Sequence, residues 1–159
     1  MATAVLPAQP ICAQDLSKGI NAAKAGDFAT AFAEWKPLAE GGDPAAQFNF
    51  GWLYATGKGV PQDYAEAVKW FRLAADQNNA NAQSKLGTAY TIGQGVPQDY
   101  TEGVKWFRIA AEHGYAPAQT QIAFAYVSGQ GIPQDFAQAL TWYHLAAVQG
   151  EAVAQLTLG

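Results

Sequence analysis

Cysteine, histidine and charged residues are scarce in this chain of 159 residues. The single cysteine, Cys12, excludes an intramolecular disulfide framework. The only histidines, His113 and His144, have no ligand spacing around them, so the sequence predicts no metal site. Only 14% of the residues are charged, the net charge is −4 and the pI is about 5.0, which argues against nucleic acid as a partner. No run of about 20 apolar residues is present, so no membrane-spanning segment is predicted.

Patterns that would indicate an enzyme are also missing. The sequence holds no Ser/His/Asp or Cys/His constellation, and its carboxylates stand mostly where they would cap helices or pair on an outer face. Its glycine-rich loops are followed by Pro-Gln-Asp, which puts a carboxylate rather than an anion-binding site at the start of the next helix. The sequence therefore predicts no catalytic residue, no cofactor and no enzymatic activity.

The chain has instead a motif that recurs three times. Gly-x-Gly, then Val or Ile, then Pro-Gln-Asp and an aromatic residue occupy residues 57–64, 93–100 and 129–136, at a constant interval of 36 residues. A fixed period of this length is typical of repeat architectures, in which small units stack on their neighbours. We therefore predict an all-α array of helical hairpins.

Each unit is predicted to hold two helices joined by the glycine-rich loop. An aspartate stands at the N-cap of the second helix, and the residue three positions later is suited to a capping box. In the first full unit, Arg72 is predicted to form an i,i+4 ion pair with Asp76. Hydrophobic periodicity and caps predict helices over residues 43–56, 63–77, 80–92, 99–113, 116–128 and 135–149.

The residues before the repeats predict a leading hairpin and a tail. The hairpin has helices over residues 15–25 and 27–40, and Pro37 is predicted to interrupt the second. The tail is interpreted either as a disordered segment or as the remnant of an export signal. The second interpretation rests on the small residues that stand just before the polar start of the first predicted helix. The predicted divisions are the tail at 1–14, the leading hairpin at 15–42, three repeat units at 43–78, 79–114 and 115–150, and the start of a further helix at 151–159.

Three motifs that recur in register carry a resemblance to a known family. Ala-Gln-x-x-x-Gly-x-x-Tyr, which begins at Ala46, is followed by Gly-x-Gly-Val-Pro-Gln-Asp and then by Trp-Phe-Arg-x-Ala-Ala. Together they resemble the Sel-one-like repeat (SLR), a relative of the tetratricopeptide repeat, over about residues 43–159, and residues 15–42 look like a leading tetratricopeptide-type hairpin. The resemblance implies an α/α right-handed superhelix with a concave inner surface. One departure is Ala123, which stands where the motif has Gly51 and Gly87.

The same resemblance implies a function. Members of this family typically act as adaptors or scaffolds for protein partners, often in bacterial envelope and signalling pathways. The implied function is therefore a non-enzymatic module that binds a peptide or protein in its concave groove, in the periplasm or a secreted location, with the cytoplasm as the alternative. Some cysteine-rich relatives have been linked to β-lactam binding, which leaves a β-lactamase-like hydrolase as an alternative function.

A third alternative is a self-assembling structural module. The sequence ends at Gly159 without a polar capping helix, which would leave Leu156 and Leu158 exposed at the end of the array. An uncapped end of a repeat array favours pairing with another chain or indicates truncation of a longer array, so homo-oligomer formation through this end is one expectation of the sequence.

The predicted binding face is the side of the first helix in each unit that points away from its recurring, buried positions. The residues on this side vary between units. Because the scaffold does not fix which side chains stand there, these positions are expected to determine which partner is bound. Large apolar groups on an open face mark binding surfaces, although the adjacent helix could instead cover them laterally. The candidate partner-binding residues are Phe48, Asn49, Trp52, Thr56, Lys85, Thr88, Ile92, Gln121, Phe124 and Ser128.

Overall fold

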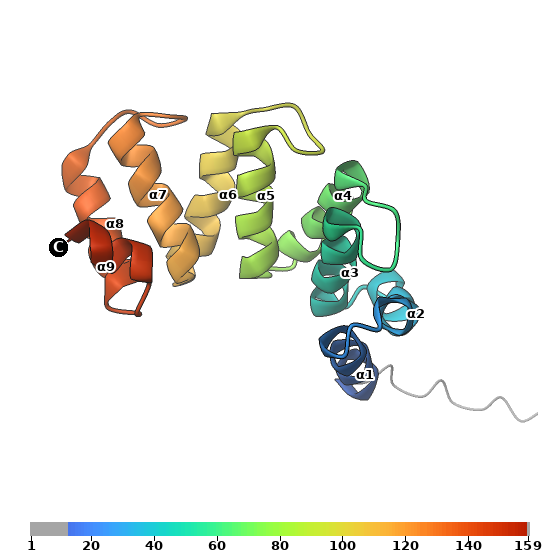
Figure 1. Ribbon diagram of the computed structural model, residues 1–159. Helices are drawn as coiled ribbons and strands as arrows, with labels where there is room; N and C mark the ends of the chain where they lie inside the picture. Colours follow the sequence, from blue (N-terminus) through green and yellow to red (C-terminus); the bar gives the residue numbers. More distant parts are fainter. Residues whose placement is uncertain (1–12, 159) are drawn as a thin grey trace, which may run out of the picture.

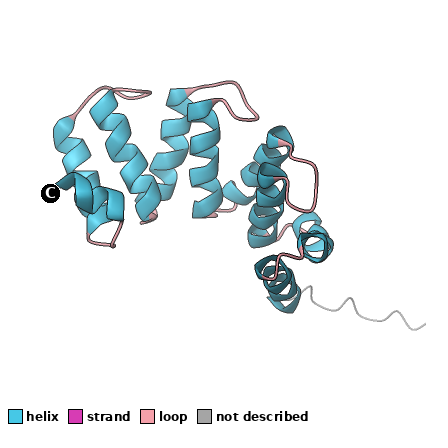
Figure 2. Cartoon of the chain, in the orientation of Figure 1, coloured by secondary structure: helices cyan, strands magenta, loops and turns pink. Residues whose placement is uncertain are grey.

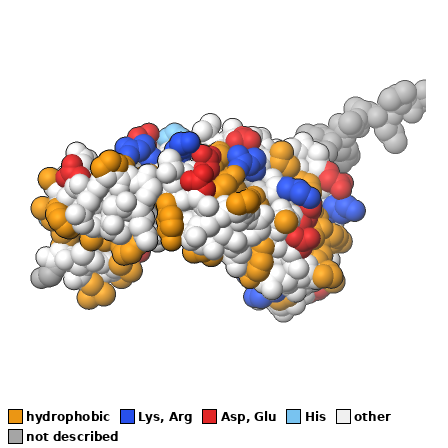
Figure 3. All heavy atoms as spheres, turned by 90° about the horizontal axis from the view of Figure 1, so that it is seen from above, with side chains coloured by type: hydrophobic (Ala, Val, Ile, Leu, Met, Phe, Trp, Pro, Cys, Tyr) orange, Lys and Arg blue, Asp and Glu red, His pale blue; other side chains and the backbone are white. Residues whose placement is uncertain are grey.

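The computed structural model describes residues 13–158 as a row of antiparallel helices joined by loops, with no strand among these residues (Figures 1 and 2). Consecutive helices form hairpins that stand side by side, and the row bends into an arc with a hollow along one edge (Figure 3). Cys12 and Gly159 lie outside the described residues, as does nearly all of the predicted tail. The helices are α1 (Ala13–Lys24), α2 (Phe28–Glu40), α3 (Pro44–Thr56), α4 (Tyr64–Ala75), α5 (Ala80–Ile92), α6 (Tyr100–Glu112), α7 (Ala116–Ser128), α8 (Phe136–Ala147) and α9 (Ala152–Leu158).

Aspartate caps start the second helix of each repeat unit, as the sequence predicts. Asp63 Oδ1 accepts from the Glu66 backbone N–H at 2.9 Å, and equivalent caps begin α6 and α8. The reciprocal half of the predicted capping box is wrong. The Glu66 carboxylate accepts instead from Lys69 Nζ at 2.7 Å and from the Trp70 indole N–H at 3.1 Å, because both donors stand on the same face of α4.

The glycine-rich loops bind each hairpin to the one before it. Gly93 ends α5 in the left-handed region, with φ of 71°, where a side chain would be strained. The second glycine, Gly95, also has positive φ, and a Cβ there would collide with the backbone carbonyl of Tyr64. Gln98 Nε2 then donates to the carbonyl of Thr91 at 2.7 Å and to the Tyr100 hydroxyl at 3.0 Å, so the loop has one fixed path.

Two sequence-based predictions about local structure are wrong. α2 continues through Pro37 to Glu40, because the buried side chains of Trp35 and Leu38 hold the last turn against the core despite the hydrogen bond that proline removes. Arg72 does not pair with Asp76 but donates to the hydroxyl of Tyr90 on the next hairpin, and its guanidinium lies 5.5 Å from the centre of the Trp106 ring.

A glutamine joins each hairpin to the helix that follows it, and this glutamine is buried at the first three of four junctions. In each case its Nε2 donates to a backbone carbonyl near the end of the preceding even-numbered helix, and that carbonyl also accepts a backbone N–H from the turn that follows the helix. The glutamine side chains in α3, α5 and α7 are at most 4% exposed. The four bonds are Gln47 to Ala39 at 3.2 Å, Gln83 to Ala75 at 3.2 Å, Gln119 to Ala111 at 3.2 Å and Gln155 to Ala147 at 3.1 Å.

The acceptor end of this glutamine is satisfied in two junctions and not in a third. Gln47 Oε1 accepts a hydrogen bond from Gln77 Nε2 at 2.9 Å, and Gln119 Oε1 accepts one from Gln149 Nε2 at 2.9 Å. The middle unit carries His113 at the position of that donor, and Gln83 Oε1 is buried with no hydrogen-bond partner among the described residues. A buried acceptor without a partner is destabilising.

Replacement of His113 by glutamine should therefore stabilise the array. We expect His113→Gln to raise the free energy of unfolding by about 1 kcal/mol, because it supplies the missing donor to Gln83 Oε1. Urea unfolding followed by circular dichroism measures the change. The reverse substitution, Gln77→His, should lower the free energy of unfolding by about 1–3 kcal/mol. Equal stability of His113→Gln and the natural chain would contradict this account of the junction.

Candidate partner-binding groove

A pocket opens where each repeat unit meets the next. The first junction pocket is a cavity of about 240 Å³, and the second is a cavity of about 280 Å³. Every residue that lines the second pocket has its counterpart, 36 positions earlier, in the lining of the first. The shared positions are 55, 56, 64, 68, 71, 85, 88, 89 and 94 in the first pocket and 91, 92, 100, 104, 107, 121, 124, 125 and 130 in the second.

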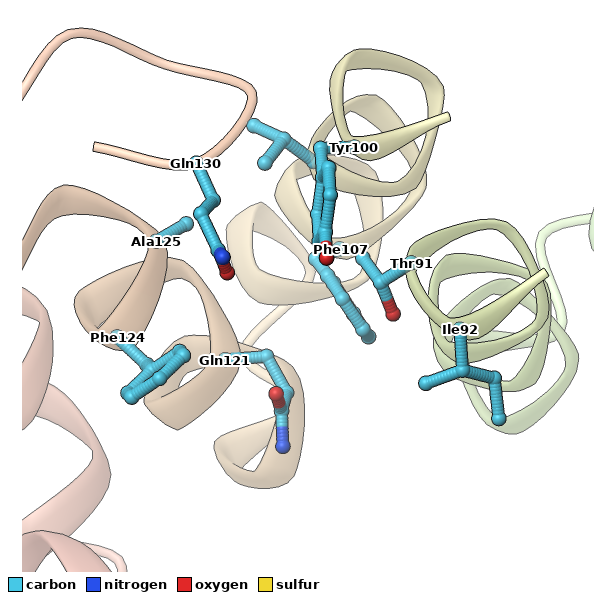
Figure 4. Close-up of a pocket in the computed structure, with 9 residues that line it drawn as sticks. Thr91, Ile92, Tyr100, Phe107, Gln121, Phe124, Ala125 and Gln130 are labelled. Carbon is cyan, nitrogen blue, oxygen red and sulfur yellow. The ribbon is translucent and has the colours of Figure 1, made fainter. Parts of the chain in front are cut away.

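Three helices and a loop build each pocket. In the second junction pocket, α6 supplies the buried Phe107 and the half-buried Tyr100, while Ile92 of α5 and Phe124 of α7 stand on opposite sides (Figure 4). Gln130 enters from the glycine-rich loop that follows α7 (Figure 4). Because the frame is fixed by packing between units, the side chains at the rim can differ without altering it.

The structure brings nine of the ten predicted binding residues into pockets. A third, shallower cavity of about 450 Å³, here called the leading depression, lies between α1 and the first repeat and is also lined by Trp35 and Lys24. The predicted residues in the first junction pocket are Trp52, Thr56, Lys85 and Thr88, and those in the second are Ile92, Gln121 and Phe124. The leading depression is lined by Phe48 and Asn49, and it shares Trp52 and Lys85 with the first junction pocket.

Ser128 lines none of these three cavities. Its hydroxyl donates to the carbonyl of Ala125 at 3.3 Å and accepts from the backbone N–H of Gln130 at 3.3 Å. The side chain therefore holds the start of the third loop, a role that its position on the helix face did not reveal.

The large apolar candidates differ in how far neighbours cover them. Phe124 is 54% exposed and Ile92 is 57% exposed, so the adjacent unit leaves both open. Phe48 and Trp52 are half-buried, with ring centres 5.8 Å from Phe71 and 6.0 Å from Phe28 respectively. The two aromatic residues of α3 are thus partly covered, by a ring of α4 in the same hairpin and by a ring of α2, whereas the later pair stays open.

Several pocket residues were missed by the sequence analysis, which considered only the first helix of each unit. Tyr64 and Tyr100 from the second helices and Gln94 and Gln130 from the loops line the junction pockets. These residues recur every 36 positions in the sequence, but a residue that is the same in each unit is normally interpreted as part of the packing between helices. Lys58 lines none of the three cavities but was also missed, although its ammonium lies 4.9 Å from the centre of the Trp52 ring and 4.8 Å from that of Phe28.

The chemistry of the groove is that of contact and hydrogen bonding. Its linings combine aromatic and aliphatic side chains with hydroxyl, amide and ammonium groups, and they include no aspartate or glutamate. Burial raises the pKa of Tyr54, Tyr115 and Tyr143, and none of these phenols lines the groove. Among the side chains that the structure describes, those of residues 16–158, no three His, Cys, Asp or Glu are grouped to hold a metal ion.

The fold and this repeated groove define the chain as an α-helical repeat protein of the solenoid type. The Sel1 repeat family matches residues 44–79, 80–115 and 116–151, and the chain belongs to that family. Sel1 repeats typically mediate protein–protein interactions. No protein with a curated description matches the chain. None of the helices in the described part of the chain has the length and apolar character needed to cross a membrane.

Solved structures show the same architecture. The chain is similar to a protective antigen of uropathogenic Escherichia coli that displays an SLR fold, with 36% identity and a TM-score of 0.86 over 91% of this chain and 32% of that one. A Sel1 repeat protein from Oxalobacter formigenes has 35% identity and a TM-score of 0.84 over 90% of this chain and 57% of its own length. Cysteine-rich protein B of Helicobacter pylori, at 13% identity and a TM-score of 0.66, shares the fold. The chain thus spans about a third of the length of the Escherichia coli antigen and just over half of the length of the Oxalobacter formigenes protein.

If Phe124 is a surface residue of the groove, its removal should cost little stability. We expect Phe124→Ala to change the free energy of unfolding by less than about 1 kcal/mol, because the ring is half exposed. Phe107→Ala, at the floor of the same pocket and 3% exposed, should cost about 3–5 kcal/mol. Thermal or urea unfolding of the two variants compares them, and equal losses would place Phe124 in the core instead.

Proposed function

We propose that the chain is a non-enzymatic scaffold that binds a protein or peptide partner along the groove formed by the two junction pockets and the leading depression. The observation that carries the proposal is the open apolar side chain pair Ile92 and Phe124 above a buried aromatic floor. Exposed large apolar groups beside fixed polar ones are typical of interaction surfaces. Membership of a family whose repeats mediate protein interactions supports the same function.

A hydrolase of the β-lactamase-like kind has less support. The groove linings offer hydroxyl groups but no carboxylate or imidazole beside them that would act as a base. The features of the groove fit recognition of a surface better than turnover of a small molecule.

We further propose a place in the bacterial envelope, periplasmic or secreted. The support is the likeness to a protective antigen from uropathogenic Escherichia coli, since a protective antigen must be accessible to antibodies. This part of the proposal concerns the compartment and stands apart from the groove.

Capture of partners from cell fractions tests both parts. The immobilised chain should retain a specific protein from the envelope fraction of the source cells and not from the cytosolic fraction. A Trp52→Ala, Phe124→Ala double variant should lose that protein, because it removes the large apolar contacts at two places in the groove. Leu73→Ala, Ile109→Ala is the matched control, since both side chains are partly exposed on second helices and line none of the three cavities. Retention by the groove variant would contradict the groove, and capture from cytosol alone would contradict the compartment.

Self-association through the face of α8 and α9 is a second candidate function. Leu140 is 50% exposed on this face. Leu156 is 83% exposed, as the sequence predicts. Leu158 is instead half-buried and packs against the buried cluster of Ala123, Tyr143, Ala146 and Ala154. An apolar face of this kind is suited to a second copy of the chain.

Light scattering over a range of concentrations tests this candidate. We expect the mass to rise with concentration, and we expect a Leu140→Lys, Leu156→Lys variant to remain a single chain because charge at the contact opposes burial. Leu73→Lys, at a side chain of similar exposure (48%) outside this face, should associate like the natural chain. A natural chain that stays monomeric at every concentration would reject the candidate.

A further inference from the structure

Most cations of the array are engaged away from the groove. Three lysines on helix surfaces pair with glutamates, and both arginines donate to tyrosine hydroxyls on the following hairpin. These pairs are Lys36 with Glu40 at 3.9 Å, Lys69 with Glu66 at 2.7 Å, Lys105 with Glu102 at 3.0 Å, Arg72 with Tyr90, and Arg108 with Tyr126 at 3.3 Å.

Three other lysines have no such partner: one lies over the ring of Trp52, and two line the leading depression together with that ring. Among the residues whose side chains the structure describes, 16–158, no carboxylate lies within ion-pair distance of Lys24, Lys58 or Lys85. Lys58 Nζ stands 4.9 Å from the centre of the Trp52 ring, and Lys24 and Lys85 line the leading depression together with that ring. The three side chains are exposed, so their ammonium groups are available to a ligand.

The positive charge is unusual because the chain as a whole carries −4. Aspartate and glutamate are absent from the linings of both junction pockets and of the leading depression. Charged side chains gather mainly on the outer edge of the arc in Figure 3, and the hollow is bordered largely by uncharged groups. One end of the groove is therefore locally cationic in an acidic protein.

The chemistry changes one unit further along. Positions 56, 85 and 88 hold Thr, Lys and Thr in the first junction pocket, whereas the equivalent positions in the second hold Ile92, Gln121 and Phe124. A ligand that follows the groove from α3 to α7 thus meets ammonium and hydroxyl groups first and an apolar cleft second.

We infer that the groove takes an extended acidic segment of a protein partner, with aspartate or glutamate side chains at Lys24, Lys58 and Lys85 and one large apolar side chain between Ile92 and Phe124. This inference rests on the proposed function and names the chemistry of its partner. An extended strand suits two small cavities placed in succession, because alternate side chains can enter them while its backbone meets the hydroxyl and amide groups at the rim. Complementary charge fixes the direction in which the segment lies.

Selection from a random library of 12-residue peptides displayed on phage tests the inference without a known partner. Panning against the natural chain should enrich peptides with two or more Asp or Glu and a Leu, Ile, Phe or Trp a few residues away. The best of them, made with a fluorescent label, is then titrated by anisotropy. Its affinity should fall as salt is raised, because the ammonium groups are exposed to screening.

Charge-matched variants separate the site from net charge. We expect the triple variant Lys24→Gln, Lys58→Gln, Lys85→Gln to bind that peptide at least about tenfold more weakly, because it loses three ion pairs, each as strong as a typical surface ion pair. Lys36→Gln, Lys69→Gln, Lys105→Gln removes the same formal charge from paired lysines elsewhere and should change affinity by no more than about twofold. Circular dichroism of both variants checks that the helices are intact.

Each other outcome overturns the inference in a distinct way. Enrichment of neutral or basic peptides that still require Trp52 and Phe124 would overturn the acidic segment and leave the groove in place. Binding that survives the Trp52→Ala, Phe124→Ala double variant would remove the groove itself. The absence of any enriched peptide would reject an extended segment as the occupant. A 12-nucleotide oligothymidylate that binds more tightly than the peptides, through the same three lysines, would replace the peptide with a nucleic acid.

Discussion

The structure depends on a hydrogen bond from a buried glutamine to the carbonyl that ends the neighbouring helix. A helix leaves its last carbonyls without intrahelical partners, and a buried helix end must satisfy them elsewhere. At successive junctions, Gln47, Gln83 and Gln119 each add a second hydrogen bond, of closely similar geometry, to a carbonyl that already accepts a backbone N–H from the turn after its helix. Since small alanines and glycines bring the hairpins close, little freedom remains in how one unit meets the next, and the curvature of the row follows.

A repeated junction produces a repeated cavity. The two junction pockets share a frame because the same carbonyl, glutamine and aromatic floor occur in each, while the rim residues are free to differ. Lys85 and Gln121 occupy equivalent places, as do Thr88 and Phe124. A single scaffold therefore presents chemically different surfaces side by side, which is how an array of similar units can recognise a ligand that is not itself repetitive.

Much of the fold was predictable because the relevant signals are local. N-cap aspartates such as Asp63 and left-handed glycines such as Gly93 bound the helices within a few residues of their observed ends. The failures involve contacts between units. Arg72 binds Tyr90 rather than its own helix, and Pro37 stays helical because Trp35 and Leu38 are buried against other helices. No pattern within one helix contains that information.

The amino-acid sequence alone determined the number and length of the helices, the 36-residue period and the variable face of each first helix, because caps, glycines and periodicity act over a few residues. Only the tertiary structure decided which side chains share a cavity. Trp52 shares the leading depression with Lys24 of the leading hairpin and Lys85 of the second unit, and the ammonium of Lys58 lies over its ring, because of how the hairpins pack on one another. The same packing left Ser128 outside the cavities and placed Tyr64 and Tyr100 within them.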